Sequence, residues 1–420
     1  MLLQSLLRPV LTPLMRGMFD APIASSAAWS PIALWPDGID SPGMWISPRD
    51  LTSQWADYTG TTPVATPGTV ADSSNPVGLA LDIRAGATVL TDPGNHMLQS
   101  TSTSRPLLSA RVNLLKYSED FSNAVWTYYV STRNGLTTAP DGTETAQLVT
   151  LNSQYAYVTQ EANLTLPSAT NQLWVRRISG NTELYLRAST GALIYATPIT
   201  ITDEWVKYSS SWVSDGNVFS IALQDRNASG QGQIAVWHPQ LNLGPTATDY
   251  QSVPGDGSTY ASGPPIAQLY DGTDDGMATA AFAAGTLIDG MDCMIVVRRD
   301  SAAATYLISD TGSRGFFEWA SGDTNRPDVS AGTPTYYVDG VACTATRGAL
   351  FTALTAGDWH IVEARNLDLS AWTALEVSSL ASYRLNGPRG DILLYPSTAS
   401  TTDKDAARQW LADYYGVTLP

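Results

Sequence analysis

Basic residues are scarce in this sequence, and lysine is the scarcest of them. The 420 residues include 23 lysines and arginines, three of them lysines, against 39 acidic residues, and the formal net charge is −16. Nucleic-acid affinity comes mainly from neutralised phosphates, and the chain has no basic cluster, so we expect no nucleic-acid partner. The same charge disfavours an anionic membrane surface, although locally arranged arginines could still bind acidic sugars.

Histidine and cysteine are nearly absent as well. His96, His238 and His360 lie far apart and show no metal-ligand spacing, so we interpret His238 and His360 as structural polar residues and expect no metal and no cofactor. Cys293 and Cys343 fall within expected strands and are interpreted as two buried thiols. A disulfide between them would require facing strands that bring their Cα atoms within bridging range.

No apolar run is long enough for a membrane span or a signal peptide. Residues 1–19 are rich in leucine, but Arg8, Pro9, Pro13 and Arg16 interrupt them well before the roughly 20 residues that a span needs. No basic region precedes the leucines, as it would in a signal peptide. We therefore expect no membrane insertion.

The N-terminal leucines instead form an apolar stripe that cannot be buried within its own segment. The stripe comprises Leu3, Leu7, Leu11 and Leu14. A loosely packed tail is one alternative. We favour an anchoring segment at residues 1–19 that docks into a partner subunit or pairs around a symmetry axis, because exposed leucines at this density would promote aggregation.

Motifs for catalysis are missing too. No serine lies in a Gly-x-Ser-x-Gly elbow, and no glycine-rich phosphate loop precedes a helix. The adjacent acids Asp203 and Glu204 are expected in a turn, where they would cap the backbone or face solvent. We therefore expect no enzymatic activity.

The composition that remains is typical of a mainly β protein. Gly, Pro, Ser and Thr are abundant, Asp outnumbers Glu, and 13 Trp and 19 Tyr are present. In residues 182–188, Leu184 and Leu186 share one face and Tyr185 and Arg187 the other, which is the period of a strand.

This alternation recurs along the chain and divides it. We predict an irregular adapter at residues 20–110, an antiparallel β-sandwich at 111–253, a linker rich in Gly, Pro and Ser at 254–263 and a second sandwich at 264–420. Strands of the second sandwich are expected at 293–298, 305–309, 316–320, 335–338 and 360–365. One helix is expected at 402–416, capped by Thr402 and ended by Gly416.

Several stretches resemble modules of tailed-phage virion proteins. The run NLLKYSEDFSNAVW at 113–126, the turn at 139–143 and the run GQGQIAVWHPQLNLGPTATDYQ at 230–251 resemble a carbohydrate-binding-like jelly roll. Residues 55–64, 76–79 and 94–96 resemble the adapter that precedes such jelly rolls. Residues 269–277 resemble the opening of a concanavalin-like, laminin-G-like domain.

Concanavalin-like folds include glycoside hydrolases, and the acidic cluster of Asp271, Asp274 and Asp275 suggests a calcium site, because hard cations bind several oxygen ligands close together. These hydrolases carry paired carboxylates, and the chain has no Glu-x-Asp-x-Glu run. Asp271, Thr273, Asp275 and Gly276 mimic the start of a calcium loop, but the twelfth position is Phe282 where a bidentate Glu is needed. We interpret the three aspartates as turn-forming residues.

The resemblance implies a non-enzymatic virion protein that is made in the host cytoplasm. It would attach to other virion proteins through its N-terminus, form a homotrimer and bind a host surface glycan or protein as a tail fibre or receptor-binding protein. A capsid decoration or head fibre protein is the alternative, and a glycan-degrading tailspike is the second. The candidates for ligand contact are aromatic, with sandwich core as the competing interpretation of each: Phe317, Trp319, Tyr336 and Tyr337.

Overall fold

The computed structural model describes most of the chain from residue 29 onward. The described residues are 29–64, 75–84, 94–111, 113–165, 168–180, 183–190, 193–213, 218–225, 232–243, 247–256, 265–283, 286–310, 315–327, 331–378 and 383–420. The predicted anchor, with Leu3, Leu7, Leu11 and Leu14, lies outside them, and so does most of the predicted linker.

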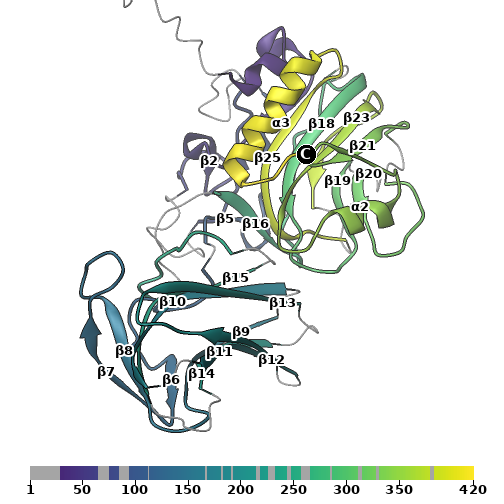
Figure 1. Cartoon of the computed structure of the whole chain (residues 1–420). Coiled ribbons are helices and arrows are strands. Elements are labelled where there is room, and N and C mark those ends of the chain that lie inside the picture. The colour runs from purple at the N-terminus through teal and green to yellow at the C-terminus, as the bar shows by residue number, and fades with distance from the viewer. Residues whose placement is uncertain are drawn as a thin grey trace, which may run out of the picture.

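Residues 126–243 fold into a sandwich of two five-stranded antiparallel sheets (Figure 1). One sheet has the order β13-β10-β15-β8-β7 and the other β12-β11-β14-β9-β6. The strands are β6 (Trp126–Tyr129), β7 (Ser131–Thr137), β8 (Ala146–Leu151), β9 (Tyr157–Thr165), β10 (Ser168–Gly180), β11 (Glu183–Thr190), β12 (Leu193–Thr200), β13 (Val206–Val213), β14 (Val218–Gln224) and β15 (Gly232–Leu243). Inward side chains such as Leu173, Val175, Leu184 and Leu186 form the core, as the period-two pattern predicted.

A second sandwich contains the C-terminal half of the chain. One sheet has eight strands, in the order β22-β21-β23-β18-β25-β16-β5 with β1 also paired to β25, and the other has the order β2-β3-β4-β17-β24-β19-β20. Its C-terminal strands are β16 (Ala267–Asp271), β17 (Met277–Thr279), β18 (Asp289–Arg298), β19 (Thr305–Ser309), β20 (Gly315–Trp319), β21 (Thr335–Val338), β22 (Val341–Cys343), β23 (Trp359–Asp368), β24 (Glu376–Val377) and β25 (Asn386–Pro396). All five strands that the sequence predicted here are present, and the mainly β class is confirmed.

The segment predicted as a separate adapter is instead built into the second sandwich. Its strands β1 (Met44–Ile46), β2 (Gln54–Trp55), β3 (Leu79–Ala80), β4 (Met97–Leu98) and β5 (Leu107–Ser109) complete both sheets. Three of them pair with C-terminal strands: β1 with β25, β5 with β16 and β4 with β17. Met44, Val77, Met97 and Leu108 are fully buried in the shared core. Strands of two or three residues separated by Pro and Gly cannot bury a core of their own, so they add to sheet edges.

Helices are few among the described residues. Beside short 3-10 turns, such as Pro31–Leu34, there are α2 (Arg347–Ala353) and α3 (Thr401–Tyr415). The predicted C-terminal helix is α3, but its cap is Ser400 rather than Thr402, because the Ser400 side chain accepts a hydrogen bond from the amide of Asp403. Gly416 ends it in a left-handed conformation, as predicted. Helix α2 was not predicted from the sequence, because its seven residues are too few for a periodic pattern.

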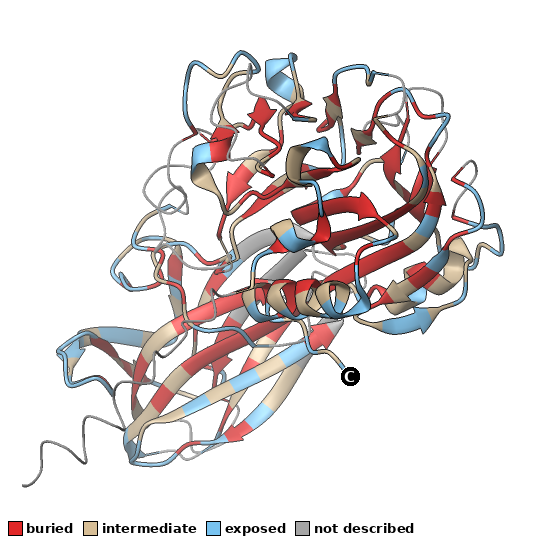
Figure 2. Cartoon of the chain, turned by 90° about the horizontal axis from the view of Figure 1, so that it is seen from above, coloured by how far each residue is buried: buried red, intermediate tan, exposed pale blue. Residues whose placement is uncertain are grey.

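Helix α3 lies on the outer face of the eight-stranded sheet (Figure 1). Its apolar side, with Ala407, Leu411 and Tyr415, packs on Met294 and Leu393 of the sheet. Figure 2 shows exposed residues alternating with buried ones along the jelly-roll strands, while the strands beneath α3 are buried over long stretches. The eight-stranded sheet is therefore covered on both faces, and the jelly-roll sheets have an outer face of their own.

Within the described residues, no helix is both long and apolar enough to cross a membrane.

Candidate functional site

A row of tyrosines crosses the outer face of one jelly-roll sheet. Tyr129 of β6 pairs with Tyr157 of β9, Tyr157 with Gln224 of β14, and Gln224 with Tyr185 of β11. Each residue of the row adjoins an inward-facing position, and because side chains alternate along a strand, the row points away from the core. In Figure 1 this sheet, with β9, β11 and β14, is the one on the far side of the jelly roll from the second sandwich.

The tyrosines are accessible and partly pre-arranged. Tyr129 is 51% exposed, and its ring stacks on that of Tyr157 with centroids 4.9 Å apart and planes at 16°. Arg187 lies in the next row, with its guanidinium carbon 5.9 Å from the centre of the Tyr157 ring. Gln224 is buried and lies between Tyr157 and Tyr185 in this row. We call this set the tyrosine face: Tyr129, Tyr157, Tyr185, Arg187 and Gln224.

The tyrosine face combines flat apolar rings with hydrogen-bonding groups. Tyr side chains present a large apolar surface and a polar hydroxyl with few rotatable bonds, and an arginine guanidinium adds planar donors. Such a surface can stack on the apolar face of a sugar ring and hydrogen bond its hydroxyl groups. The strand pattern predicted that Tyr185 and Arg187 share a face opposite Leu184 and Leu186, which is confirmed. Their meeting with Tyr129 and Tyr157 depends on strand order, which the sequence analysis did not predict.

The aromatic residues that the sequence analysis named for ligand contact lie elsewhere. Phe317, Trp319 and Tyr336 are almost completely buried in the core of the second sandwich, so the competing core interpretation is correct for all three. Phe317 and Tyr336 touch there, with ring centroids 6.1 Å apart. All five residues of β20 are buried, because α2 packs against this edge strand. Tyr337 is half-buried, and the guanidinium of Arg365 lies 4.2 Å from its ring centre.

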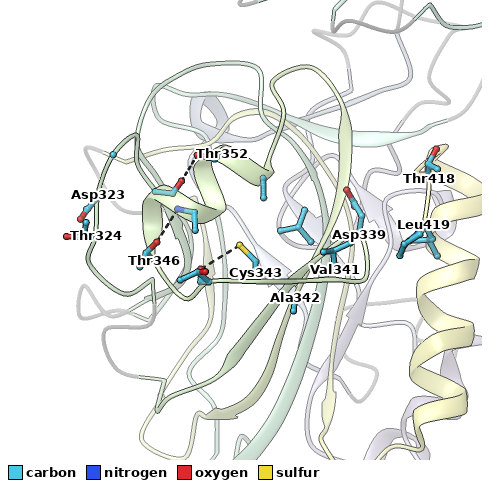
Figure 3. A pocket seen from close by; sticks show the side chains of 17 residues that line it. Asp323, Thr324, Asp339, Val341, Ala342, Cys343, Thr346, Thr352, Thr418 and Leu419 are labelled. Atoms are coloured by element: carbon cyan, nitrogen blue, oxygen red, sulfur yellow. Dashed lines mark hydrogen bonds between the residues drawn. The ribbon is translucent and has the colours of Figure 1, made fainter.

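A cleft of about 940 Å³ lies between β21, β22, α2 and residues 418–420 (Figure 3). Its lining is mainly apolar, and Figure 3 shows Asp323 and Asp339 on opposite sides of it. Both carboxylates are engaged in the fold. Asp339 Oδ2 lies 2.7 Å from Nδ1 of His360, and Asp323 accepts a hydrogen bond from the amide of Asn325. The expected structural role of His360 agrees with this contact.

The two cysteines are free thiols in different surroundings. Cys293 pairs with Ala364, Ala364 with Tyr336, and Tyr336 with Cys343. Three strand spacings, about 14 Å, therefore separate the two cysteines, whereas a disulfide needs Cα atoms within about 7 Å. Cys293 is 1% exposed, whereas Cys343 is half-buried and lines the cleft, so the expectation of a buried thiol holds fully only for Cys293.

This difference predicts one reactive thiol in the native protein. We expect a small aromatic disulfide reagent to modify one thiol per folded chain and two thiols per chain in denaturant. Burial raises the pKa of the Cys343 thiol, so the reaction should be faster at pH 9 than at pH 7. Cys343→Ser should abolish the native reaction and Cys293→Ser should leave it unchanged. Modification of both thiols in the folded chain would contradict the burial of Cys293.

The aspartates at 271, 274 and 275 form a turn, as the sequence analysis predicted. Their carboxylate oxygens lie within 4.8 Å of one another. Asp271 accepts hydrogen bonds from the amides of Thr273 and Asp274, and Asp275 accepts one from the amide of Asp271. Asp274 accepts a hydrogen bond from the Ser104 hydroxyl, with 2.8 Å between the two oxygens, and this bond ties the turn to the N-terminal part of the sandwich.

Asp275 should make the stability of this sandwich depend on pH. Burial, and then the charges of Asp271 and Asp274, raise its pKa to about 7, well above the value of about 3.9 in an unfolded chain. A raised carboxyl pKa means that the folded state binds the proton more tightly. The stabilisation is therefore complete below pH 4 and is lost as the pH rises through 7. Asp275→Asn should reduce the fall in melting temperature between pH 5 and pH 8. If the melting temperature of Asp275→Asn depends on pH as that of the unchanged protein does, this prediction is wrong.

Comparisons with known proteins extend over about a third of the chain. No protein-family model and no curated protein matches it. Among solved structures, an exo-β-agarase is 11% identical, with 33% of this chain and 26% of that one covered at a TM-score of 0.28. The CBM22-1 xylan-binding domain from Paenibacillus barcinonensis Xyn10C is 14% identical. The match covers 33% of this chain and 97% of that domain, at a TM-score of 0.27. The enzymatically active domain of bacteriophage CBA120 tailspike protein 4 is 15% identical. The match covers 31% of this chain and 21% of that one, at a TM-score of 0.26.

Proposed function

We propose that the protein is a non-enzymatic, glycan-binding component of a tailed-phage virion, a tail fibre or receptor-binding protein. In this proposal the N-terminal segment attaches a homotrimer to other virion proteins, and the tyrosine face binds a polysaccharide of the host surface. The observation that carries the proposal is the row of Tyr129, Tyr157 and Tyr185 across four strands, on a sheet face that points away from the second sandwich.

The spacing and exposure of this row suit contact with an extended sugar chain better than packing in a protein core. Neighbouring strands are about 4.8 Å apart, so a chain lying across the strands would meet a ring or a polar group at each strand. Tyr129 is half-exposed and Tyr157 and Tyr185 are partly exposed, so their rings supply preformed contact area to a ligand. Three copies in a homotrimer would raise the apparent affinity for a polymer well above that of one face.

The test is to measure binding of the full-length protein to an oligosaccharide array and to compare variants. Tyr129→Ala combined with Tyr157→Ala should weaken binding to the array ligands by about tenfold or more, since each aromatic contact contributes about 0.5–1.5 kcal/mol. Tyr58→Ala is the matched control, because Tyr58 is 45% exposed and lies in the second sandwich. Equal affinity of the double variant and the unchanged protein would refute the proposed face. Release of new reducing ends from bound glycan would refute the non-enzymatic part.

A further inference from the structure

A second aromatic face lies on the opposite sheet of the jelly roll. Trp174 of β10 pairs with Trp237 of β15 on one side and with Lys207 of β13 on the other. Val175 and Val236, the neighbours of the two tryptophans, are in the core, so the tryptophans point outward. The two indole rings lie 6.4 Å apart at 60° and are both half-buried.

Two cations border these tryptophans. Arg176 follows Trp174 on the same outer face, and its guanidinium carbon lies 5.2 Å from the ring centre of Trp205. Its Nε atom is buried and has no hydrogen-bond partner among the residues that the structure describes. Lys207 is exposed beside Trp174. We call this set the tryptophan face: Trp174, Arg176, Trp205, Lys207 and Trp237.

Neither cation of the tryptophan face is neutralised by a carboxylate in the part of the chain that the structure describes. The ion pairs found there include Arg177 with Asp203 at 2.6 Å, directly beside the face, but none with Arg176 or Lys207. The adjacent Asp203 is thus already paired. This arrangement is unusual in a chain with a net charge of −16 and only three lysines.

The remaining charged groups lie at the edge of the face. Glu204 precedes Trp205 in the chain and is exposed. Beyond Trp237, the ring of His238 stacks between Trp237 and Tyr250, and its Nε2 lies 3.9 Å from Glu119. Burial lowers the pKa of His238 to about 4, against the opposing charge of Asp141, so this ring is neutral at pH 7. The positive charge of the face therefore comes from Arg176 and Lys207.

The tryptophan face also lies apart from the cavity at the contact between the two sandwiches. A cavity of about 530 Å³ at that contact is lined by Asn242, Thr248 and Asp249 of the jelly roll and by Trp359 and His360 of the second sandwich. Asn242 pairs with Thr170, four residues along β10 from Trp174. At about 3.4 Å per residue, Thr170 and Trp174 are about 14 Å apart along the strand.

We propose that the tryptophan face is a second glycan site, specific for sugars that carry a carboxylate. Sugar rings stack on Trp174 and Trp237, and the carboxylate accepts hydrogen bonds from the guanidinium of Arg176, with Lys207 adding a second positive charge. A guanidinium matches a planar carboxylate through two parallel hydrogen bonds, which favours a uronate over a neutral sugar. This site goes beyond the proposed function, because it names the charge of a ligand and does not require the tyrosine face.

The experiment compares polygalacturonate with its methyl ester, in which each charged carboxylate is replaced by a neutral ester. We expect the full-length protein to bind polygalacturonate in 50 mM salt and to bind its methyl ester at least tenfold more weakly. Binding to polygalacturonate should be weaker in 500 mM salt than in 50 mM salt, because salt screens the charge of the exposed Lys207. Arg176→Met should lower the affinity for polygalacturonate at least tenfold and leave the binding of the methyl ester unchanged.

The variants also decide the location of the site. Lys207 is exposed, so Lys207→Glu should fold normally and should lower the affinity for polygalacturonate at least tenfold, even if Arg176→Met fails to fold. Arg133→Met removes a positive charge from the exposed edge strand β7, which belongs to neither face, and should have no effect. The proposal is overturned by equal affinity for the two polymers, by no binding to either, or by equal losses in Lys207→Glu and Arg133→Met. If Tyr129→Ala with Tyr157→Ala abolishes polygalacturonate binding, the tyrosine face is the acidic site and the inference fails while the proposed function stands.

Discussion

Arg408→Met should destabilise the second sandwich by about 3 kcal/mol and should loosen α3 from its sheet. Glu363 of β23 is fully buried, and Arg408 of α3 donates hydrogen bonds to both of its carboxylate oxygens. Arg365 pairs with the same carboxylate at 2.8 Å from a more exposed position. Removing Arg408 leaves the buried carboxylate of Glu363 with one of its two arginine partners. Breaking a buried ion pair in this way costs about 3–5 kcal/mol of stability. The remaining Arg365 places the expected loss at the lower end of that range.

Hydrogen exchange of the α3 amides, measured together with urea unfolding, checks this prediction. Glu363→Gln combined with Arg408→Met removes the buried charge as well and should recover part of the loss. Arg133→Met is the matched control, because Arg133 is exposed on the edge strand β7 and its removal should change stability by less than about 0.5 kcal/mol. If the amides of residues 401–415 exchange at the same rate in Arg408→Met and in the unchanged protein, the ion pair does not hold the helix.

Local patterns in the sequence were sufficient to predict the strand at 182–188, five strands of the second sandwich and the C-terminal helix. The alternation of Leu184 and Leu186 with Tyr185 and Arg187 identifies both a strand and its inward face, and the structure confirms it. The cap of α3 was wrong by two residues, because Ser400 and Thr402 have similar capping ability and only the backbone geometry chooses between them.

Features that depend on distant pairing could not be predicted from the sequence. The tyrosine face exists because β6, β9, β14 and β11 are neighbours in one sheet, although Tyr129 and Tyr185 are 56 positions apart. The buried state of Phe317 and Trp319 depends on α2, which lies about 30 residues further along the chain. The period of a strand shows which residues share a face, but it does not show which other element covers that face.

The same limitation explains why the adapter was predicted as a separate segment. Its short strands follow no long periodic pattern, and one buried carboxylate holds several of its parts together. Asp82 is completely buried and accepts hydrogen bonds from the amides of Trp45 and Asn95 and from the guanidinium of Arg84. Arg84 in turn donates to the carbonyl of Ser41 at 2.6 Å. The amide of Asp82 itself donates to Nδ1 of His96.

Asp82→Asn should therefore destabilise the N-terminal part of the second sandwich by about 3–5 kcal/mol. The substitution leaves the charge of Arg84 buried without its partner, and it turns amide hydrogens toward groups that are themselves donors. Amide hydrogen exchange should accelerate at Met44–Ile46 and Met97–Leu98, the strands that this network joins. The jelly-roll strands are the internal control and should exchange as before. Asp82→Asn combined with Arg84→Met removes both charges and should recover part of the loss. If strand β1 keeps its protection in Asp82→Asn, this segment is held by its apolar contacts with β25 and the core, and the carboxylate is dispensable.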